Sequence, residues 1–131
     1  MLIVRGTRLL WPGPQVRIEA VILSAGTCPA GEFLDDLDQI SRKSGVREKM
    51  ESLFERLGQG HRLSRKRFRK VEDEIWEFKY DQVRILCFSN PGRWICTHGL
   101  IKKQDRLPRS EIDRAKQIRS EFLRGLNEED R

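Results

Sequence analysis

The chain has 131 residues, with 26 lysines and arginines against 20 aspartates and glutamates and a formal net charge of +6. This length fits one domain, and a mean hydropathy of −0.63 is typical of a water-soluble protein. No stretch approaches the roughly 18 apolar residues that a membrane-spanning helix requires. The composition therefore excludes a helical membrane protein, and its basic excess favours a polyanionic or acidic partner.

The first 15 residues are expected to form an appendage outside the domain. They begin with an apolar run, but Arg5 and Arg8 interrupt it before the core of a signal peptide can form. The Trp-Pro-Gly-Pro sequence at residues 11–14 breaks any regular element. We therefore expect a single domain over residues 16–126 and a frayed tail over residues 127–131.

Three cysteines, Cys28, Cys87 and Cys96, form an odd set without a C-x-x-C pair. Such a set favours buried free thiols in a reducing compartment. We therefore expect a cytoplasmic protein.

The first half of the domain reads as one strand and two helices. Residues 16–23 are apolar or alternating and predict a strand. Residues 30–43 and 46–57 carry apolar side chains at helical spacing and are separated by Ser44 and Gly45. These helices are expected to form a hairpin that packs on a sheet.

The second half predicts three strands and a final helix. Residues 75–80 alternate between apolar and charged side chains, and a tight turn at residues 81–82 leads into a second strand. Lys79 then lies opposite Arg84, with the aromatic side chains on the other face. A turn at residues 89–93 leads to a third strand over residues 94–101, and a helix follows Pro108 with Ser110 as its N-cap. The predicted fold is α+β with the order β-α-α-β-β-β-α and an antiparallel sheet.

The register of the last two strands decides where His98 points. A five-residue turn places Arg84 opposite His98 and gives a polar row of Lys79, Arg84 and His98. A four-residue turn moves His98 to the core face, because a slip of one residue exchanges the faces. On the polar face His98 could transfer a proton near neutral pH, whereas in the core it would hydrogen-bond a neighbour. The charged row could also be the solvated face of an antiparallel sheet.

Residues 61–70 form the densest basic run in the chain. Its cations are Arg62, Arg65, Lys66, Arg67, Arg69 and Lys70. The run predicts contacts with a nucleic-acid phosphate backbone, or else a solvated loop or an edge strand protected by charge. Since it directly precedes the charged strand, the two could form one electropositive surface.

The residue inventory favours chemistry carried out by charge. The two histidines, His61 and His98, lie far apart, and the sequence contains no metal-ligand spacing, glycine-rich phosphate loop or nucleophile elbow. RNA carries its own nucleophile, the 2′-hydroxyl beside the scissile phosphate. Lysine, arginine and histidine suffice to orient that group, transfer protons and stabilise the phosphorane, with no cofactor or metal.

Three motifs resemble the RelE/HigB toxin superfamily, and its phage-derived HigB-like branch in particular. They are I-W-E-F-K at residues 75–79, H-G-L-I-K-K at residues 98–103 and L-P-x-x-E-I-x-x-A at residues 107–115, with Arg84 five residues after Lys79. The resemblance implies a small α/β fold with an antiparallel sheet and a helical hairpin. It also implies cleavage of mRNA at the ribosome and neutralisation by a cognate antitoxin, for which we expect a helix-turn-helix protein.

The resemblance places the family's basic positions on Lys79, Arg84, Lys102 and Lys103, and with His98 these form the predicted catalytic set. The chain departs from some relatives by carrying Glu77 in place of a second lysine and by lacking a tyrosine or histidine after Ile101. A non-catalytic RNA- or ribosome-binding module and a partner-binding domain therefore remain alternatives to an endoribonuclease.

Overall fold

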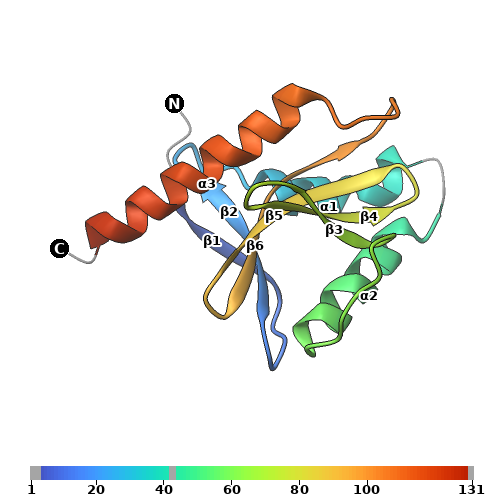
Figure 1. Ribbon diagram of the computed structural model, residues 1–131, viewed down its shortest axis with the longest axis horizontal. Coiled ribbons are helices and arrows are strands. Elements are labelled where there is room, and N and C mark those ends of the chain that lie inside the picture. Colours follow the sequence, from blue (N-terminus) through green and yellow to red (C-terminus); the bar gives the residue numbers. More distant parts are fainter. Residues whose placement is uncertain (1–3, 42–43, 130–131) are drawn as a thin grey trace.

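Six strands form one mixed sheet in the order β1-β2-β6-β5-β4-β3 (Figure 1). The computed structural model describes residues 4–41 and 44–129. The strands are β1 Val4–Trp11, β2 Arg17–Leu23, β3 Phe68–Glu72, β4 Ile75–Tyr80, β5 Val83–Asn90 and β6 Arg93–Ile101. The helices are α1 Pro29–Ile40, α2 Val46–Gly58 and α3 Arg109–Glu129. The predicted α+β class, the helical hairpin and the C-terminal helix are confirmed.

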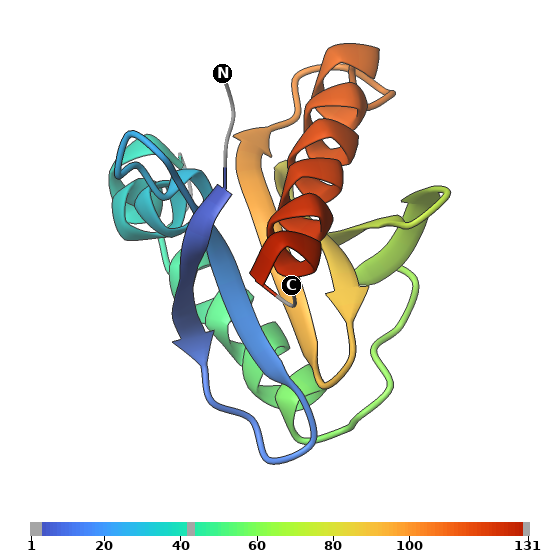
Figure 2. The same ribbon diagram turned by 90° about the vertical axis from the view of Figure 1, so that its left-hand side faces the viewer.

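Helices cover both faces of the sheet, with α1 and α2 on one face and α3 on the other (Figure 2). On the α1/α2 face, Leu37 and Phe54 pack with Phe78 and Ile85 in one apolar cluster. On the α3 face, the packed side chains are Val21, Leu86, Phe88, Ile95, Ala115, Ile118 and Phe122. Strand β5 is buried on both faces, which explains its nearly continuous apolar sequence.

Strand β1 was not predicted, an edge strand at β3 was only one alternative for the basic run, and the sheet is not purely antiparallel. Residues 4–11 form β1, which pairs antiparallel with β2, so this part of the chain is an edge strand rather than an appendage. The following turn packs on the end of α2, where Gln15 N–H donates to the Gly58 carbonyl at 2.9 Å. Strand β2 pairs parallel with β6, and β3 forms the opposite edge of the sheet.

The predicted helix ends also change. Helix α1 ends at Ile40, and the expected extension to Lys43 crosses residues 42–43, which lie outside the described part. Helix α3 begins at Arg109, so Ser110 lies inside it, and it continues to Glu129 where fraying was expected from Asn127.

No helix in residues 4–41 or 44–129 is both long enough and apolar enough to cross a bilayer. All three cysteines are buried free thiols, as predicted.

The β4–β5 register is confirmed, whereas the β5–β6 register is not. Lys79 pairs with Arg84 as predicted. Strand β6 begins after a two-residue turn with Gly92 at φ 80°, which alone would put His98 on the α1/α2 face. A bulge at Thr97 shifts the register by one residue. Arg84 therefore pairs with Leu100 rather than His98, and His98 returns to the face that carries Arg84.

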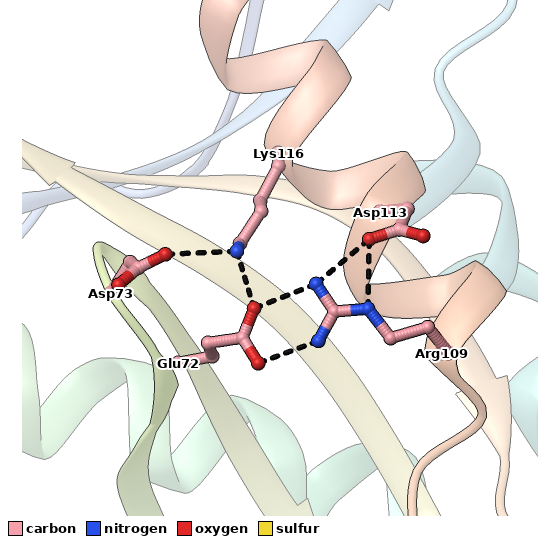
Figure 3. A network of polar contacts seen from close by, with 5 residues as sticks. All are labelled: Glu72, Asp73, Arg109, Asp113 and Lys116. Atoms are coloured by element: carbon pink, nitrogen blue, oxygen red, sulfur yellow. Dashed lines mark hydrogen bonds and ion pairs between the residues drawn. The ribbon is translucent and has the colours of Figure 1, made fainter.

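An ion-pair network joins the β3–β4 turn to the first half of α3 (Figure 3). Arg109 donates from its two terminal nitrogens to Glu72 at 2.6 and 2.7 Å, and its Nε donates to Asp113 at 3.0 Å. Lys116 contacts Glu72 and donates to Asp73 at 2.8 Å. Hydrogen bonds from these two cations lower the pKa of Glu72 to about 2. The network fixes the start of α3 against the sheet.

Replacing Glu72 with glutamine is expected to lower the urea midpoint of unfolding at pH 7. Because the folded-state pKa of Glu72 lies below its ordinary value of 4.5, the ionised carboxylate stabilises the fold above that value. This stabilisation is lost as the pH falls from 4.5 towards 2, so the difference between wild type and variant should shrink across that window. The control is Glu55→Gln on exposed α2 surface. A Glu72→Gln effect of constant size from pH 7 to pH 3 would contradict the prediction.

Candidate functional site

A buried carboxylate lies between two arginines where β3, β4 and β5 run side by side. Glu77 is 2% exposed, and its Oε1 lies 3.2 Å from Arg84 Nε and 3.6 Å from Arg69 Nε. The Glu77–Arg84 contact is an ion pair that lacks the alignment of a hydrogen bond. Arg84 also donates from Nη1 to the carbonyls of Asp81 at 2.7 Å and Val83 at 2.9 Å. These contacts fix the guanidinium of Arg84, which is 6% exposed.

Lys79 and Lys102 extend this group of cations towards solvent. Lys79 is half-buried opposite Arg84. Burial lowers the pKa of Lys79, and the charges of Arg69, Arg84 and Lys102 lower it further. Lys102 continues the strand pairing beyond β6, since its N–H donates to the Gln82 carbonyl at 2.7 Å. We call Arg69, Lys79, Arg84 and Lys102 the cationic cluster.

Two hollows adjoin the cluster at the end of β6. An open groove of about 790 Å³ lies between the end of α1, the β4–β5 turn and Lys102 and Lys103. A smaller hollow of about 280 Å³ is lined by Lys102, Lys103 and Glu111 at the start of α3. Neither lysine makes an ion pair or a side-chain hydrogen bond with any described residue. Their ammonium groups are therefore available to an anion that enters either hollow.

His98 lies on the same face as Arg84 but beneath the start of α3. It is 1% exposed, with Nε2 3.2 Å from Glu111 Oε2 and Nδ1 3.0 Å from Thr97 Oγ1. Burial and, to a smaller extent, the charge of Arg114 lower the pKa of His98 to about 4, although the contact with Glu111 acts in the opposite direction. The imidazole is therefore neutral at pH 7. It lies on the face expected for the polar row but is buried there, a combination that neither alternative from the sequence included.

The basic run of residues 61–70 divides between different environments. Arg67 lies over the Tyr80 ring on the α1/α2 face, 4.8 Å from its centroid, whereas Arg69 joins the cationic cluster. A pocket of about 400 Å³ is lined by Leu57, Arg62, Leu63, Arg65, Phe68, Arg69, Lys70 and Trp76. We call it the basic pocket. Lys66 is exposed outside it. The run is thus partly a loop and partly an edge strand, and Arg69 links it to the cluster.

Two acidic residues of the site were not predicted in these roles. Glu77 was placed only on the polar face, although its position between arginines on neighbouring strands could have suggested an ion pair. Glu111 was noted only as part of the motif at residues 107–115, with no role in the site. Its contact with His98 spans 13 residues of sequence, and no local pattern signals it.

Replacing Glu77 with alanine is expected to lower the free energy of unfolding by about 3–5 kcal/mol, because Arg84 would stay buried without its counter-charge. Urea denaturation measures this loss, with exposed Glu74→Ala as a control that should change stability by less than about 0.5 kcal/mol. The double variant Glu77→Met/Arg84→Met should regain most of the loss, since it removes both charges together. A loss below about 1 kcal/mol for Glu77→Ala would show that Arg84 is held by other contacts.

The chain matches the model of a known protein family. The family described as phage-derived protein Gp49-like (DUF891) matches residues 32–120, about two thirds of the chain. No curated protein matches the chain. The matched range begins within α1 and ends within α3, so it contains the cationic cluster, the basic pocket, His98 and Glu111. The chain belongs to the Gp49-like family of phage-derived proteins.

Proposed function

We propose that the chain is the toxin of a type II toxin–antitoxin system and cleaves mRNA through the RNA's own 2′-hydroxyl. The cationic cluster is the observation that carries the proposal. Its four cations gather at one end of the sheet around a single buried carboxylate, next to a groove and a hollow. Such a site attracts a phosphodiester and stabilises the extra negative charge of a phosphorane.

The reaction needs no group beyond the RNA and the side chains of the site. The 2′-oxygen loses its proton and forms a bond to phosphorus, and the bond from phosphorus to the 5′-oxygen breaks. That 5′-oxygen takes a proton from a neighbouring ammonium group, for which Lys79 is suited because its pKa is lowered. The products are a 2′,3′-cyclic phosphate and a 5′-hydroxyl. Arg84 would stabilise the phosphorane, a contribution of about 2–4 kcal/mol in comparable oxyanion sites.

The basic pocket supports binding of the flanking RNA strand. Arg62, Arg65 and Lys70 lie around the half-buried ring of Trp76. Cations that follow a phosphate backbone, together with an aromatic ring on which a base can stack, are the usual means of holding single-stranded RNA. The pocket is lined by Phe68 and Trp76 of the α1/α2 face, whereas the cationic cluster lies on the α3 face. An RNA strand that contacted both would therefore pass around the β3 edge at Arg69.

The proposal includes an antitoxin and the ribosome as partners. An acidic segment of a helix-turn-helix antitoxin that covers the cationic cluster would block access to phosphate, and opposite charge would speed its association. Association with the ribosome would supply mRNA in an extended single-stranded form.

A non-catalytic RNA-binding module is the second candidate. The observation that favours it is burial: Arg84 is engaged by Glu77, and His98 cannot reach a substrate. Cleavage separates the two candidates, because a binding module retains RNA without shortening it.

Lys79→Ala is expected to slow RNA cleavage about 10²–10³-fold, because the variant loses a positive charge that stabilises the phosphorane in the transition state. Lys79 makes no ion pair with any described residue, so the variant should fold normally. Lys49→Ala, on the exposed surface of α2, is the matched control. Cleavage of a labelled single-stranded RNA by the purified proteins measures the rates.

The same variants test the function in cells. Expression of the wild-type chain alone should arrest growth and truncate cellular mRNAs, and Lys79→Ala should restore growth at equal protein level. Normal growth with intact transcripts at high wild-type expression would remove the toxin proposal.

A further inference from the structure

We propose that Glu111 is the base that accepts the proton of the RNA 2′-hydroxyl, and that His98 is the positioning residue that holds its carboxylate. This inference rests on the proposed RNA-cleaving function. Glu111 can reach a substrate. His98, which the sequence analysis offered for proton transfer, is enclosed beneath α3.

Glu111 is placed to touch a ligand in the hollow beside the cationic cluster. It lies in the first turn of α3, its side chain is 27% exposed, and it lines the hollow together with Lys102 and Lys103. The other wall includes Leu100, which pairs directly with Arg84. A phosphate bound between the lysines would therefore bring its neighbouring ribose towards the carboxylate, with Arg84 on the adjacent strand.

The hydrogen bonds around His98 specify how it holds Glu111. An ionised carboxylate accepts only, so His98 Nε2, 3.2 Å from Glu111 Oε2, must carry the ring proton. Because the ring is neutral, Nδ1 is then an acceptor, and the Thr97 hydroxyl shares its proton between Nδ1 at 3.0 Å and the Leu86 carbonyl at 3.3 Å. The chain Thr97–His98–Glu111 leaves the other carboxylate oxygen, Oε1, for a proton from the hollow.

The Thr97 bulge is what makes this arrangement possible. Without it, the β5–β6 turn would direct His98 to the α1/α2 face, away from α3. Thr97 itself is fully buried, so the bulge is fixed by packing. A bulge that redirects a side chain is a common feature beside active sites.

Charged groups from several elements surround Glu111. His98 lies below it on β6, Lys102 and Lys103 lie across the hollow, and Arg114 lies one turn along α3 and acts on His98.

In the cleavage step, Glu111 takes the proton as the 2′-oxygen bonds to phosphorus, and the leaving 5′-oxygen receives a proton from an ammonium group of the cationic cluster. One proton is taken up and one is released, so the step balances.

Glu111→Gln separates a catalytic role from a structural one. The glutamine carbonyl still accepts from His98, so the thermal midpoint and RNA affinity should stay unchanged, but an amide cannot act as a base. A general base contributes about 10²–10⁴-fold, so cleavage of a labelled single-stranded RNA should slow by that factor. The rate should also lose its fall at low pH. Glu55→Gln makes the same chemical change on the exposed surface of α2; it is the control and should cleave normally.

His98→Gln tests the positioning role. In the wild-type background it should slow cleavage, whereas in the Glu111→Gln background it should add no further loss. If Glu111→Gln fails to fold, Glu111→Asp serves instead, with a partial loss of rate and a retained fall at low pH. If the wild-type chain cleaves RNA and Glu111→Gln or Glu111→Asp cleaves it with the same rate and pH profile, the inference is overturned while the proposed function stands. Absence of cleavage by the wild-type chain would overturn the proposed function and the inference together.

Discussion

Burying a charged side chain destabilises a fold unless a counter-charge lies beside it, and the buried Glu77 lies between arginines from both neighbouring strands. Arg84 and Arg69 are in turn held near each other, although their charges repel. This ion-pair group requires β3, β4 and β5 to be in one register, because a slip of one residue would move a charge into the α1/α2 core. The ion pairs that stabilise the buried Glu77 therefore also concentrate positive charge at one end of the sheet.

Helix α3 completes the site from the other side. Its apolar face packs over the middle of the sheet, and its first turn places Glu111 over His98. The ion-pair network with the β3–β4 turn fixes that position (Figure 3). The cationic cluster and the Thr97–His98–Glu111 chain thus come from different parts of the sequence. They adjoin at Lys102, which belongs to the cluster and lines the same hollow as Glu111.

Local patterns were sufficient for the elements in which each residue contacts near neighbours. Alternation in residues 75–80 and a two-residue turn predicted the Lys79–Arg84 pair, and helical spacing predicted α2. Strand β1 was missed because the prolines after it were interpreted as an end of structure, whereas they form a turn against Gly58. The partner of Arg84 was wrong because the β5–β6 turn is shorter than expected, with two residues, and because a single-residue bulge has no sequence signature. The role of Glu111 was missed because it depends on a long-range contact.

The chemistry itself is tested most directly with the purified wild-type chain and a pair of RNAs that differ at one atom. One RNA carries the 2′-hydroxyl at the cleaved nucleotide, and the other carries a 2′-deoxyribose there. In the presence of a metal chelator, the first should give a 2′,3′-cyclic phosphate and a 5′-hydroxyl, and the second should stay intact at that nucleotide. Cleavage of the deoxy-substituted RNA at the same position, or products with a 5′-phosphate, would contradict attack by the 2′-hydroxyl.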